Sequence, residues 1–270
     1  MYTFTSKHHK LQIPFEPFLF GVKVNVHLIL EYAAFIVGFR YYIFLRKNSR
    51  DKISSNNRLS IIIGATLGAL IGSRIMGFLE YPFIENHVSQ TQIAESFWIQ
   101  LLNAKSIMGG LFGGLLGVET SKKIIGEKHS SGDLFTFPII LGIFLGRIGC
   151  FLTGTNEFTY GIETSSMLGM NLGDGINRHP LALYELIFLL LLAVTLKYVH
   201  QKYLLKNGDL FKWFMIAYFG FRFFIEFLKP NEFLVFGLSS IQILCMVCIL
   251  YYRKTILLIP HHIKVSKVKT

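Results

Sequence analysis

Apolar residues in this 270-residue chain come in long, nearly unbroken runs separated by short polar stretches. A helix needs about 20 predominantly apolar residues to cross the hydrocarbon core of a bilayer, and the runs approach this length. They predict about seven membrane-spanning helices. The predicted spans are residues 24–45, 59–79, 106–125, 134–152, 180–199, 210–228 and 235–252.

This pattern is typical of an all-α membrane protein, a polytopic bundle of transmembrane helices. The chain shows no internal repeat and no polar stretch long enough for a separate soluble domain, so we expect residues 1–270 to form a single integral membrane domain. No short apolar stretch with a small-residue cleavage site opens the chain, and the first span is therefore expected to act as an uncleaved targeting signal.

The formal net charge of +11 raises the question of a nucleic-acid partner. The basic residues fall in short clusters between apolar runs rather than along one face, so we expect no nucleic acid and instead a lipid bilayer as the surroundings. Lys and Arg concentrate after the first, third, fifth and seventh spans, beginning with Arg46 and Lys47. Cytoplasmic segments carry this excess, which places the N-terminus outside and the C-terminus in the cytoplasm.

Three arginines inside the spans are the first candidate site residues, because an ionisable group near the bilayer centre costs at least about 2.5 kcal/mol. Arg74, Arg147 and Arg222 lie on the second, fourth and sixth spans, all of which run outward. With a rise of 1.5 Å per residue, each lies roughly 8 to 10 Å below the outer boundary. Guanidinium groups at one depth predict a phosphate site, because the planar fork binds two phosphate oxygens and keeps its charge.

Carboxylates and tyrosines near the same depth are expected to orient these arginines. Glu226 follows Arg222 by one helical turn and Tyr218 precedes it by one turn, so the three share a helix face. The fifth span runs inward and places Tyr184 and Glu185 close to the same outer surface. Structural Arg–Glu pairing is the alternative for any one pair, but it gives no reason for the whole set to collect at one depth.

Small residues and cysteines predict packing. Glycines recur every fourth position on the second and third spans, which favours close approach of helix backbones; space for a lipid chain or a substrate backbone is the alternative. These glycines are Gly64, Gly68 and Gly72, then Gly109, Gly113 and Gly117. The three cysteines, Cys150, Cys245 and Cys248, lie in apolar segments, so we expect no disulfide framework and no metal site.

Several motifs carry a family resemblance. They are Gly146-Arg147-Ile148-Gly149, Arg178-His179-Pro180 with Leu183-Tyr184-Glu185, the set Tyr218, Gly220, Arg222 and Glu226, Gly72 with Arg74, and Gly237 with Ser239 and Gln242. In this order they resemble the bacterial prolipoprotein diacylglyceryl transferases. Members of that family move a diacylglyceryl group from phosphatidylglycerol onto the cysteine thiol of a lipoprotein signal peptide.

The resemblance implies a transferase of the bacterial inner membrane, with its active site toward the outer face. It implies phosphatidylglycerol and the lipobox cysteine of a prolipoprotein signal peptide as substrates, and no cofactor. Arg147 and Arg222 would be catalytic, clamping the phosphate. The substrate-binding set would be Arg147, Arg74, Glu157, Gly161, His179, Tyr184, Glu185, Tyr218 and Glu226.

The chain departs from the family pattern at positions that matter for proton transfer. Phe112 stands where the family has a histidine before a Gly-Gly pair, and Cys150 stands where it usually has an asparagine. The ending of the first motif is stretched by about three residues, to Glu157 and Gly161. The general base is therefore open; His179 is the nearest histidine by depth.

Two further functions stay open. A related transferase could use the same lipid and another acceptor, as Phe112 and the altered loop suggest. A small-solute transporter is disfavoured, because the inner halves of the spans carry few charges besides Arg40 and Glu119. A covalent role for Cys150 is also disfavoured, since a thiol in an apolar stretch is ordinarily inert, although Arg147 lies one turn away.

Overall fold

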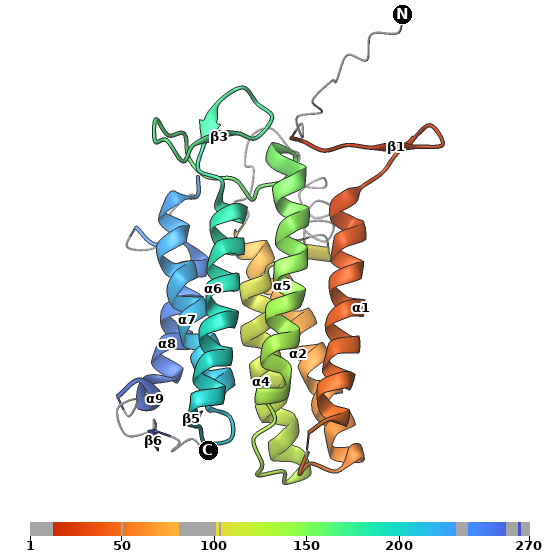
Figure 1. Ribbon diagram of the computed structural model, residues 1–270, viewed down its shortest axis with the longest axis vertical. Coiled ribbons are helices and arrows are strands. Elements are labelled where there is room, and N and C mark those ends of the chain that lie inside the picture. The colour runs from red at the N-terminus through yellow and green to blue at the C-terminus, as the bar shows by residue number, and fades with distance from the viewer. Residues whose placement is uncertain are drawn as a thin grey trace, which may run out of the picture.

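The computed structural model describes residues 13–49, 51–80, 101–102, 104–230, 237–257 and 264–265. Within these ranges the chain is a bundle of long helices with short connecting segments (Figure 1). The α-helices are α1 (Val26–Lys47), α2 (Ser55–Glu80), α4 (Ile107–Ile125), α5 (Asp133–Thr153), α6 (Leu181–Lys202), α7 (Asp209–Ile225), α8 (Ser240–Tyr251) and α9 (Arg253–Leu257).

Short 3-10 helices and strands connect these helices. The 3-10 helices η1 (Gly154–Asn156) and η2 (Glu226–Leu228) directly follow α5 and α7. The strands pair antiparallel as β1 (Phe18–Leu19) with β2 (Val22–Lys23), β3 (Met170–Asn171) with β4 (Asn177–Arg178), and β5 (Tyr203–Leu204) with β6 (Lys264–Val265).

A helix occupies each of the seven ranges predicted from the apolar runs. Four segments in the described part of the chain are long and apolar enough to cross a membrane: α1, α2, α6 and Asp133–Asn156, which joins α5 to η1. Helix α8 is also apolar but shorter, at 12 residues. The prediction of an α-helical, multi-pass membrane protein is therefore confirmed.

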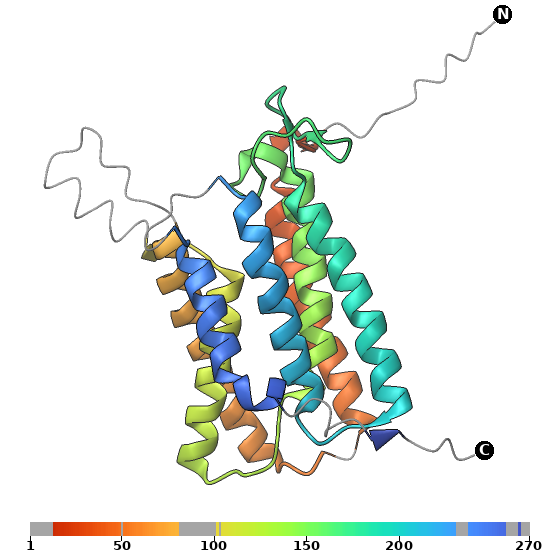
Figure 2. The ribbon, with the colours of Figure 1, turned by 90° about the vertical axis from the view of Figure 1, so that its left-hand side faces the viewer.

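The helices fall into two groups that lie side by side in Figure 2, with α2, α4 and α8 in one and α1, α5, α6 and α7 in the other. Helix α5 contacts α1, α6 and α7, whereas α2 packs along α4. Helix α8 contacts α7 as well as α2 and α4, so α7 and α8 join the groups.

The glycine repeats take part in helix packing, as predicted, and the structure shows that they face each other at the seam between α2 and α4. A Cβ atom on Gly113 would lie 2.3 Å from the carbonyl oxygen of Gly68, and one on Gly72 would lie 2.3 Å from that of Gly109. Only glycine permits backbones to approach so closely, and in lipid such close packing is a main source of helix association.

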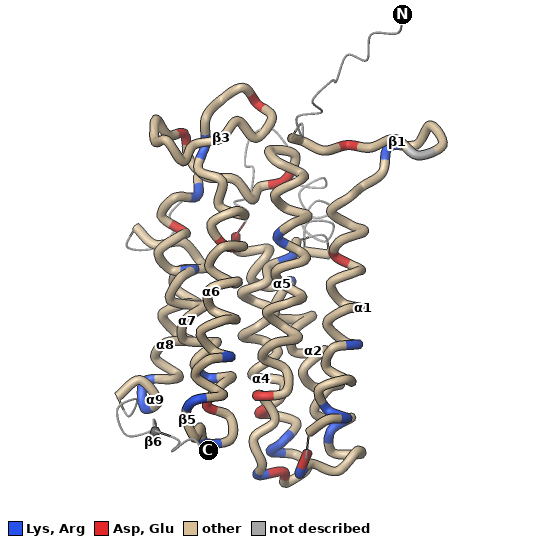
Figure 3. Tube along the Cα trace, in the orientation of Figure 1, with Lys and Arg blue, Asp and Glu red and all other residues tan. Residues whose placement is uncertain are grey.

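Apolar side chains fill the interior and also cover the outside. Phe214, Cys245 and Cys248 are fully buried, which agrees with a packing role for the two cysteines. On the outside of α1, Phe35 is 71% exposed and Ile36 64% exposed. Charged residues gather toward the two ends of the helices, with long uncharged stretches between them (Figure 3). An apolar belt between two charged ends is the surface that a bilayer requires.

Candidate active site

Five polar side chains from three helical segments meet inside the bundle, and we call them the site cluster. Arg147 comes from α5, Glu185 from α6, Tyr218 and Arg222 from α7, and Glu226 from the start of η2. The residues are 8% exposed or less. All five were predicted from the sequence, and the structure brings them into contact.

Glu185 is the centre of the cluster. One carboxylate oxygen, Oε2, accepts a hydrogen bond from Nη1 of Arg222 at 2.9 Å. The other, Oε1, accepts from the Tyr218 hydroxyl at 2.6 Å and lies 2.8 Å from Nε of Arg147. Nη2 of Arg222 donates to Oε2 of Glu226 at 3.0 Å, the pair expected from their spacing. Two arginines and two glutamates leave the cluster formally neutral, which makes burial of these charges tolerable.

The arginines of the site cluster keep unused hydrogen-bonding capacity. Among the described residues, Nε of Arg222 has no hydrogen-bond partner although it is buried. Nε of Arg147 lies close enough to Glu185 for an ion pair, but it is not aligned for a hydrogen bond. Buried donors are nearly always satisfied in folded proteins, so two such atoms on arginines that share the Glu185 carboxylate favour a site for an anion.

The end of α7 is held by the start of α8. Ser239 and Gln242 form a reciprocal capping box, in which Ser239 Oγ accepts from the Gln242 backbone and Gln242 Oε1 accepts from the Ser239 backbone. The Gln242 side-chain amide also donates to the carbonyl oxygen of Phe223, at 3.2 Å. The Gly237–Gln242 motif therefore fixes the helical turn that follows Arg222.

Three predicted residues lie together where the loop after α5 meets the start of α6. The backbone N–H of Gly161 donates to the carbonyl oxygen of His179 at 3.0 Å. A Cβ atom on Gly161 would lie 2.6 Å from the Cβ of His179, so only glycine fits. The His179 ring contacts the Tyr184 hydroxyl through Nδ1 at 3.1 Å. This arrangement ties the loop after α5 to the first turn of α6, the helix that carries Glu185.

The neighbouring loop is held by charge. Asp174 accepts a hydrogen bond from Nε of Arg178 at 2.6 Å, and this bond lowers the pKa of the Asp174 carboxyl. The Arg178 guanidinium also lies 5.0 Å from the centre of the Tyr160 ring. The strand pair β3–β4 is therefore fastened to the segment that carries Gly161.

One expected site residue, Arg74, has another partner, and Phe112 lies against the core. Arg74 donates from Nη1 to the carbonyl oxygen of Ala104 at 3.0 Å. Phe112 packs against the apolar core from α4, in the place where the family carries a histidine. The depth argument placed Arg74 beside Arg147 and Arg222, and the contacts of the described residues do not join it to their network.

A second group of functional side chains adjoins the site cluster, and we call it the relay cluster: His27, Cys150 and Glu157. Nδ1 of His27 lies 2.8 Å from Oε1 of Glu157, and Nε2 lies 3.6 Å from Sγ of Cys150. Nη1 of Arg147 lies 3.7 Å from the same sulfur. His27 is a functional candidate that was not predicted from the sequence. Its position at the start of the first span was the available signal, because the predicted orientation places it at the outer level.

Imidazole, thiolate and carboxylate are all ligands that Zn²⁺ accepts, and the three ligand atoms lie within 4.8 Å of one another. In the relay cluster, however, the His27 ring stands between its partners, with one nitrogen facing each. A metal ion takes only one of these nitrogens. The atoms do not converge on a common point, and we assign no metal to them.

Comparison with known proteins agrees with these features. A sequence model of the family "Prolipoprotein diacylglyceryl transferase" matches residues 17–258. A phosphatidylglycerol–prolipoprotein diacylglyceryl transferase of Ehrlichia ruminantium is 32% identical over 85% of this chain and 94% of its own length. Proteins of the same name from Campylobacter hominis and Chlorobaculum tepidum are 29% and 28% identical, over 84% and 92% of this chain and 83% and 91% of their own lengths. The chain belongs to the prolipoprotein diacylglyceryl transferase family.

Proposed function

We propose that this chain transfers the diacylglyceryl group of phosphatidylglycerol to the cysteine thiol of a prolipoprotein signal peptide. Family membership over most of the chain supports the reaction. The observation that carries the assignment to this site is a pair of buried arginines whose Nε atoms make no hydrogen bond to any described residue. Phosphatidylglycerol presents a phosphate next to the carbon that is transferred.

In this proposal the site cluster acts on the leaving group. The peptide thiolate attacks the glycerol carbon, the carbon–oxygen bond to the phosphate breaks, and glycerol phosphate departs with increased negative charge. Arg147 and Arg222 bind the phosphate oxygens and stabilise that charge, the type of contribution that is usually the largest in such reactions. Glu185, Glu226 and Tyr218 hold the guanidinium groups in place through the bonds described above.

Other predicted residues take part at the edge of the site. His179, Tyr184 and Gly161 shape the mouth through which the substrates enter, and Glu157 acts through His27. Arg74 is retained as a binding residue on the basis of its depth; it also supports the segment around Ala104.

The proposed topology has seven spans, with the N-terminus outside and the C-terminus in the cytoplasm. The distribution of Lys and Arg supports this orientation, and the seven helices that occupy the predicted ranges support the number. The site cluster then faces the outer half of the bacterial inner membrane, where a translocated signal peptide would present its cysteine.

Complementation tests the proposed function. A bacterial strain depleted of its own transferase is supplied with this chain, and a reporter lipoprotein is examined by mass spectrometry. We expect growth and a mass increase equal to one diacylglyceryl group. Good expression without either would instead favour a related transferase with another acceptor, the alternative that Phe112 and Cys150 keep in view.

A further inference from the structure

The relay cluster offers a proton acceptor in a chain that has Phe112 at the position of the expected histidine. We propose that His27 is the proton acceptor of this transferase and that the Cys150 thiol passes the substrate's proton to it. The inference rests on the proposed function, because it supplies the base that thiol transfer needs. It is drawn from three side chains brought together by α1, α5 and the segment after η1.

The backbone of α5 is shaped to receive His27. Gly149 faces α1, and a Cβ atom there would lie 2.9 Å from Cδ2 of the His27 ring and 3.3 Å from its Cα. Any larger residue would push the two helices apart. Gly149 therefore sets the imidazole directly against the next residue of α5, Cys150.

Glu157 determines which nitrogen of His27 is the base. A carboxylate accepts hydrogen bonds and donates none, so Nδ1 of His27, 2.8 Å from Oε1, carries the hydrogen. Nε2 is then the acceptor, and it faces the Cys150 sulfur. A carboxylate that orients a histidine in this way also stabilises the imidazolium that forms on proton transfer.

Glu157 reaches His27 because the chain turns sharply after α5. Gly154 has a φ of +58°, and a Cβ atom there would lie 2.2 Å from the carbonyl oxygen of Leu172. Thr155 follows and donates its backbone N–H to that same oxygen at 3.1 Å. The turn returns the chain toward α1 and places Glu157 beside the imidazole.

Cys150 lies between the base and the place where a substrate would bind. Its sulfur contacts His27 on one side and Arg147 on another. The residue also lines a small pocket bordered by Tyr160, Leu172 and Leu181. A thiol in that pocket, close to a phosphate held by Arg147, would meet the Cys150 sulfur before it could reach the imidazole.

The proton steps balance without another reactant. Cys150 gives its proton to Nε2 of His27, and the resulting thiolate takes the proton of the incoming peptide thiol. The peptide thiolate then forms the sulfur–carbon bond as the carbon–oxygen bond to phosphate breaks. Glycerol phosphate leaves, and the proton on His27 is released to it or to water. The proton exchange between the two thiols breaks one sulfur–hydrogen bond and forms another of the same kind.

The charges around His27 are consistent with this role. On the same helix, one turn further, Glu31 is bound by Lys105 at 2.8 Å and its charge is compensated. Arg147 and Glu157 face the relay cluster from α5 and the segment after it, one charge of each sign. The net field at the imidazole therefore comes mainly from its own carboxylate partner.

A covalent role for Cys150 fits the reaction less well. Attack by Cys150 on the lipid would form an alkyl thioether, and the second transfer would have to break that stable carbon–sulfur bond. In the relay the cysteine sulfur exchanges only protons.

The test measures transfer of labelled lipid to a lipobox peptide in proteoliposomes, at pH 7 and pH 9.5, for the full chain and its variants. His27→Gln is expected to lower the rate about 100-fold at pH 7, within the range of lost general-base catalysis. The ratio of the wild-type rate to the His27→Gln rate should be at least tenfold smaller at pH 9.5, because the thiol of the peptide substrate, with a pKa of about 8.5, ionises there without a base. For Cys150→Ala, the ratio of the wild-type rate to the variant rate should also be smaller at pH 9.5 than at pH 7.

His129→Gln is the matched control, because His129 is also paired with a carboxylate, Glu127 at 2.7 Å, but lies in the α4–α5 connection at the opposite end of the bundle. It should transfer at the wild-type rate at both pH values. Both pH values are measured on one sample of each variant, so loss of folded protein affects them equally and cancels in their ratio.

A His27→Gln deficit of the same size at both pH values would mean a structural role and overturn the inference. So would a rate within threefold of wild type at pH 7, or loss of wild-type activity on chelation with return on adding zinc. If the wild-type chain itself transfers no lipid, the proposed function fails, and the inference fails with it.

Discussion

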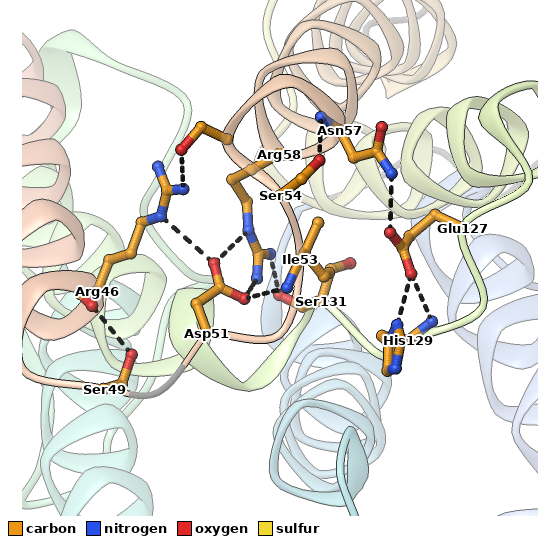
Figure 4. Close-up of polar contacts among 11 residues, drawn as sticks. Arg46, Ser49, Asp51, Ile53, Ser54, Asn57, Arg58, Glu127, His129 and Ser131 are labelled. Atoms are coloured by element: carbon orange, nitrogen blue, oxygen red, sulfur yellow. Dashed lines mark hydrogen bonds and ion pairs between the residues drawn. The ribbon is translucent and has the colours of Figure 1, made fainter.

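Two arginine–carboxylate networks lie at opposite ends of the bundle, and their arginines are satisfied to different degrees. At the end away from the site, Arg58 of α2 is 1% exposed and is bound by Asp51 and by the carbonyl oxygen of Ser131 (Figure 4). Nε, Nη1 and Nη2 of Arg58 all donate to these two acceptors. We call Arg58, Asp51 and Ser131 the anchor cluster. In the site cluster, Arg147 and Arg222 are similarly buried, yet each has an Nε without a hydrogen bond in the described part of the chain.

The difference separates a structural arginine from functional ones. Arg58 ties the connection between α1 and α2 to the connection between α4 and α5, and each of its three nitrogens already donates to Asp51 or Ser131. A buried hydrogen-bond donor without a partner lowers stability by about 1 to 3 kcal/mol. A ligand-binding site recovers this free energy when its ligand binds. The comparison therefore predicts that changes in the site cluster reduce transfer, whereas changes in the anchor cluster reduce stability.

The largest effect is expected from Arg222→Gln or Arg147→Gln. Each substitution removes one of the two cations that stabilise the departing phosphate, and we expect the transfer rate to fall about 1,000-fold. The measurement is transfer of labelled lipid to a lipobox peptide, per folded molecule. Arg222→Lys should recover only part of the rate, because an ammonium keeps the charge but lacks the planar fork.

Arg58→Gln is the matched substitution in the anchor cluster. It should leave the rate per folded molecule within about threefold of wild type, since Arg58 faces no substrate. A loss of rate comparable to that of Arg222→Gln, in protein that is equally folded, would erase the distinction between the two clusters.

Changes in the anchor cluster should affect stability more than they affect the transfer rate. Removal of Arg58 takes two charged hydrogen bonds from Asp51 and leaves the more distant Arg46, at 3.3 Å, as the cation that still pairs with it. We expect Arg58→Gln to lower the free energy of unfolding by about 2 kcal/mol. Thermal or denaturant unfolding in detergent measures this loss. Equal stability of Arg58→Gln and the wild type would show that the anchor cluster does not hold the loops.

Tyr218→Phe sharpens the comparison within the site cluster. The hydroxyl of Tyr218 donates to Glu185 at 2.6 Å, and its loss should loosen the carboxylate that positions both arginines. A hydrogen bond to a charged group contributes about 1.5 kcal/mol, so we expect roughly a tenfold lower rate with the chain still folded. Tyr198→Phe serves as the control. Tyr198 is exposed near the other end of α6, and its hydroxyl accepts a hydrogen bond from Lys202 instead of contacting Glu185. Equal rates for the two variants would remove Tyr218 from the account.

The smallest expected effect is on the acid dependence of thermal stability, and it involves Glu127. Hydrogen bonds from the His129 backbone, the Asn57 side chain and the His129 ring lower the pKa of the Glu127 carboxyl to about 2. A carboxyl with a lowered pKa stabilises the fold above its unfolded pKa of about 4.3, and this contribution is lost as the pH falls toward 2. The wild type should therefore lose slightly more thermal stability between pH 5 and pH 3 than Glu127→Gln does, by about 2 °C or less. Identical pH profiles would contradict this.

Burial alone would raise the pKa of Asp51, but bonds from Arg58 and the Ile53 backbone lower it on balance. The same acid-dependent loss therefore applies to the anchor cluster, and Asp51→Asn should reduce it as well. The measurement is again the melting temperature at the two pH values.

The helices were predictable because lipid requires long apolar runs, and runs are visible in a sequence. The range 59–79 became α2 and the range 180–199 became α6, with ends shifted by a few residues. The four-residue glycine repeats also predicted close helix packing, although they did not show that α2 and α4 would be each other's partners.

The candidate active site as a whole was predictable only in part. Spacing within one helix gave the Arg222–Glu226 pair, and depth brought Glu185 and Arg147 to the same level. Depth does not give direction around a helix axis, so it could not show that Arg74 turns to the Ala104 carbonyl oxygen. The contact of His27 with Cys150 depends on the packing of α1 against Gly149, a tertiary detail that no single-helix pattern contains.

The most direct test of the central claim is phosphate recognition by the arginines of the site cluster. Binding of short-chain phosphatidylglycerol to the purified chain is measured in detergent, with the corresponding diacylglycerol, which lacks phosphate, as the reference ligand. We expect Arg147→Gln and Arg222→Gln each to weaken phosphatidylglycerol binding at least tenfold, about 1.4 kcal/mol, leaving diacylglycerol binding unchanged. Arg58→Gln should bind both lipids as the wild type does. Equal affinity of all these proteins for phosphatidylglycerol would contradict the account.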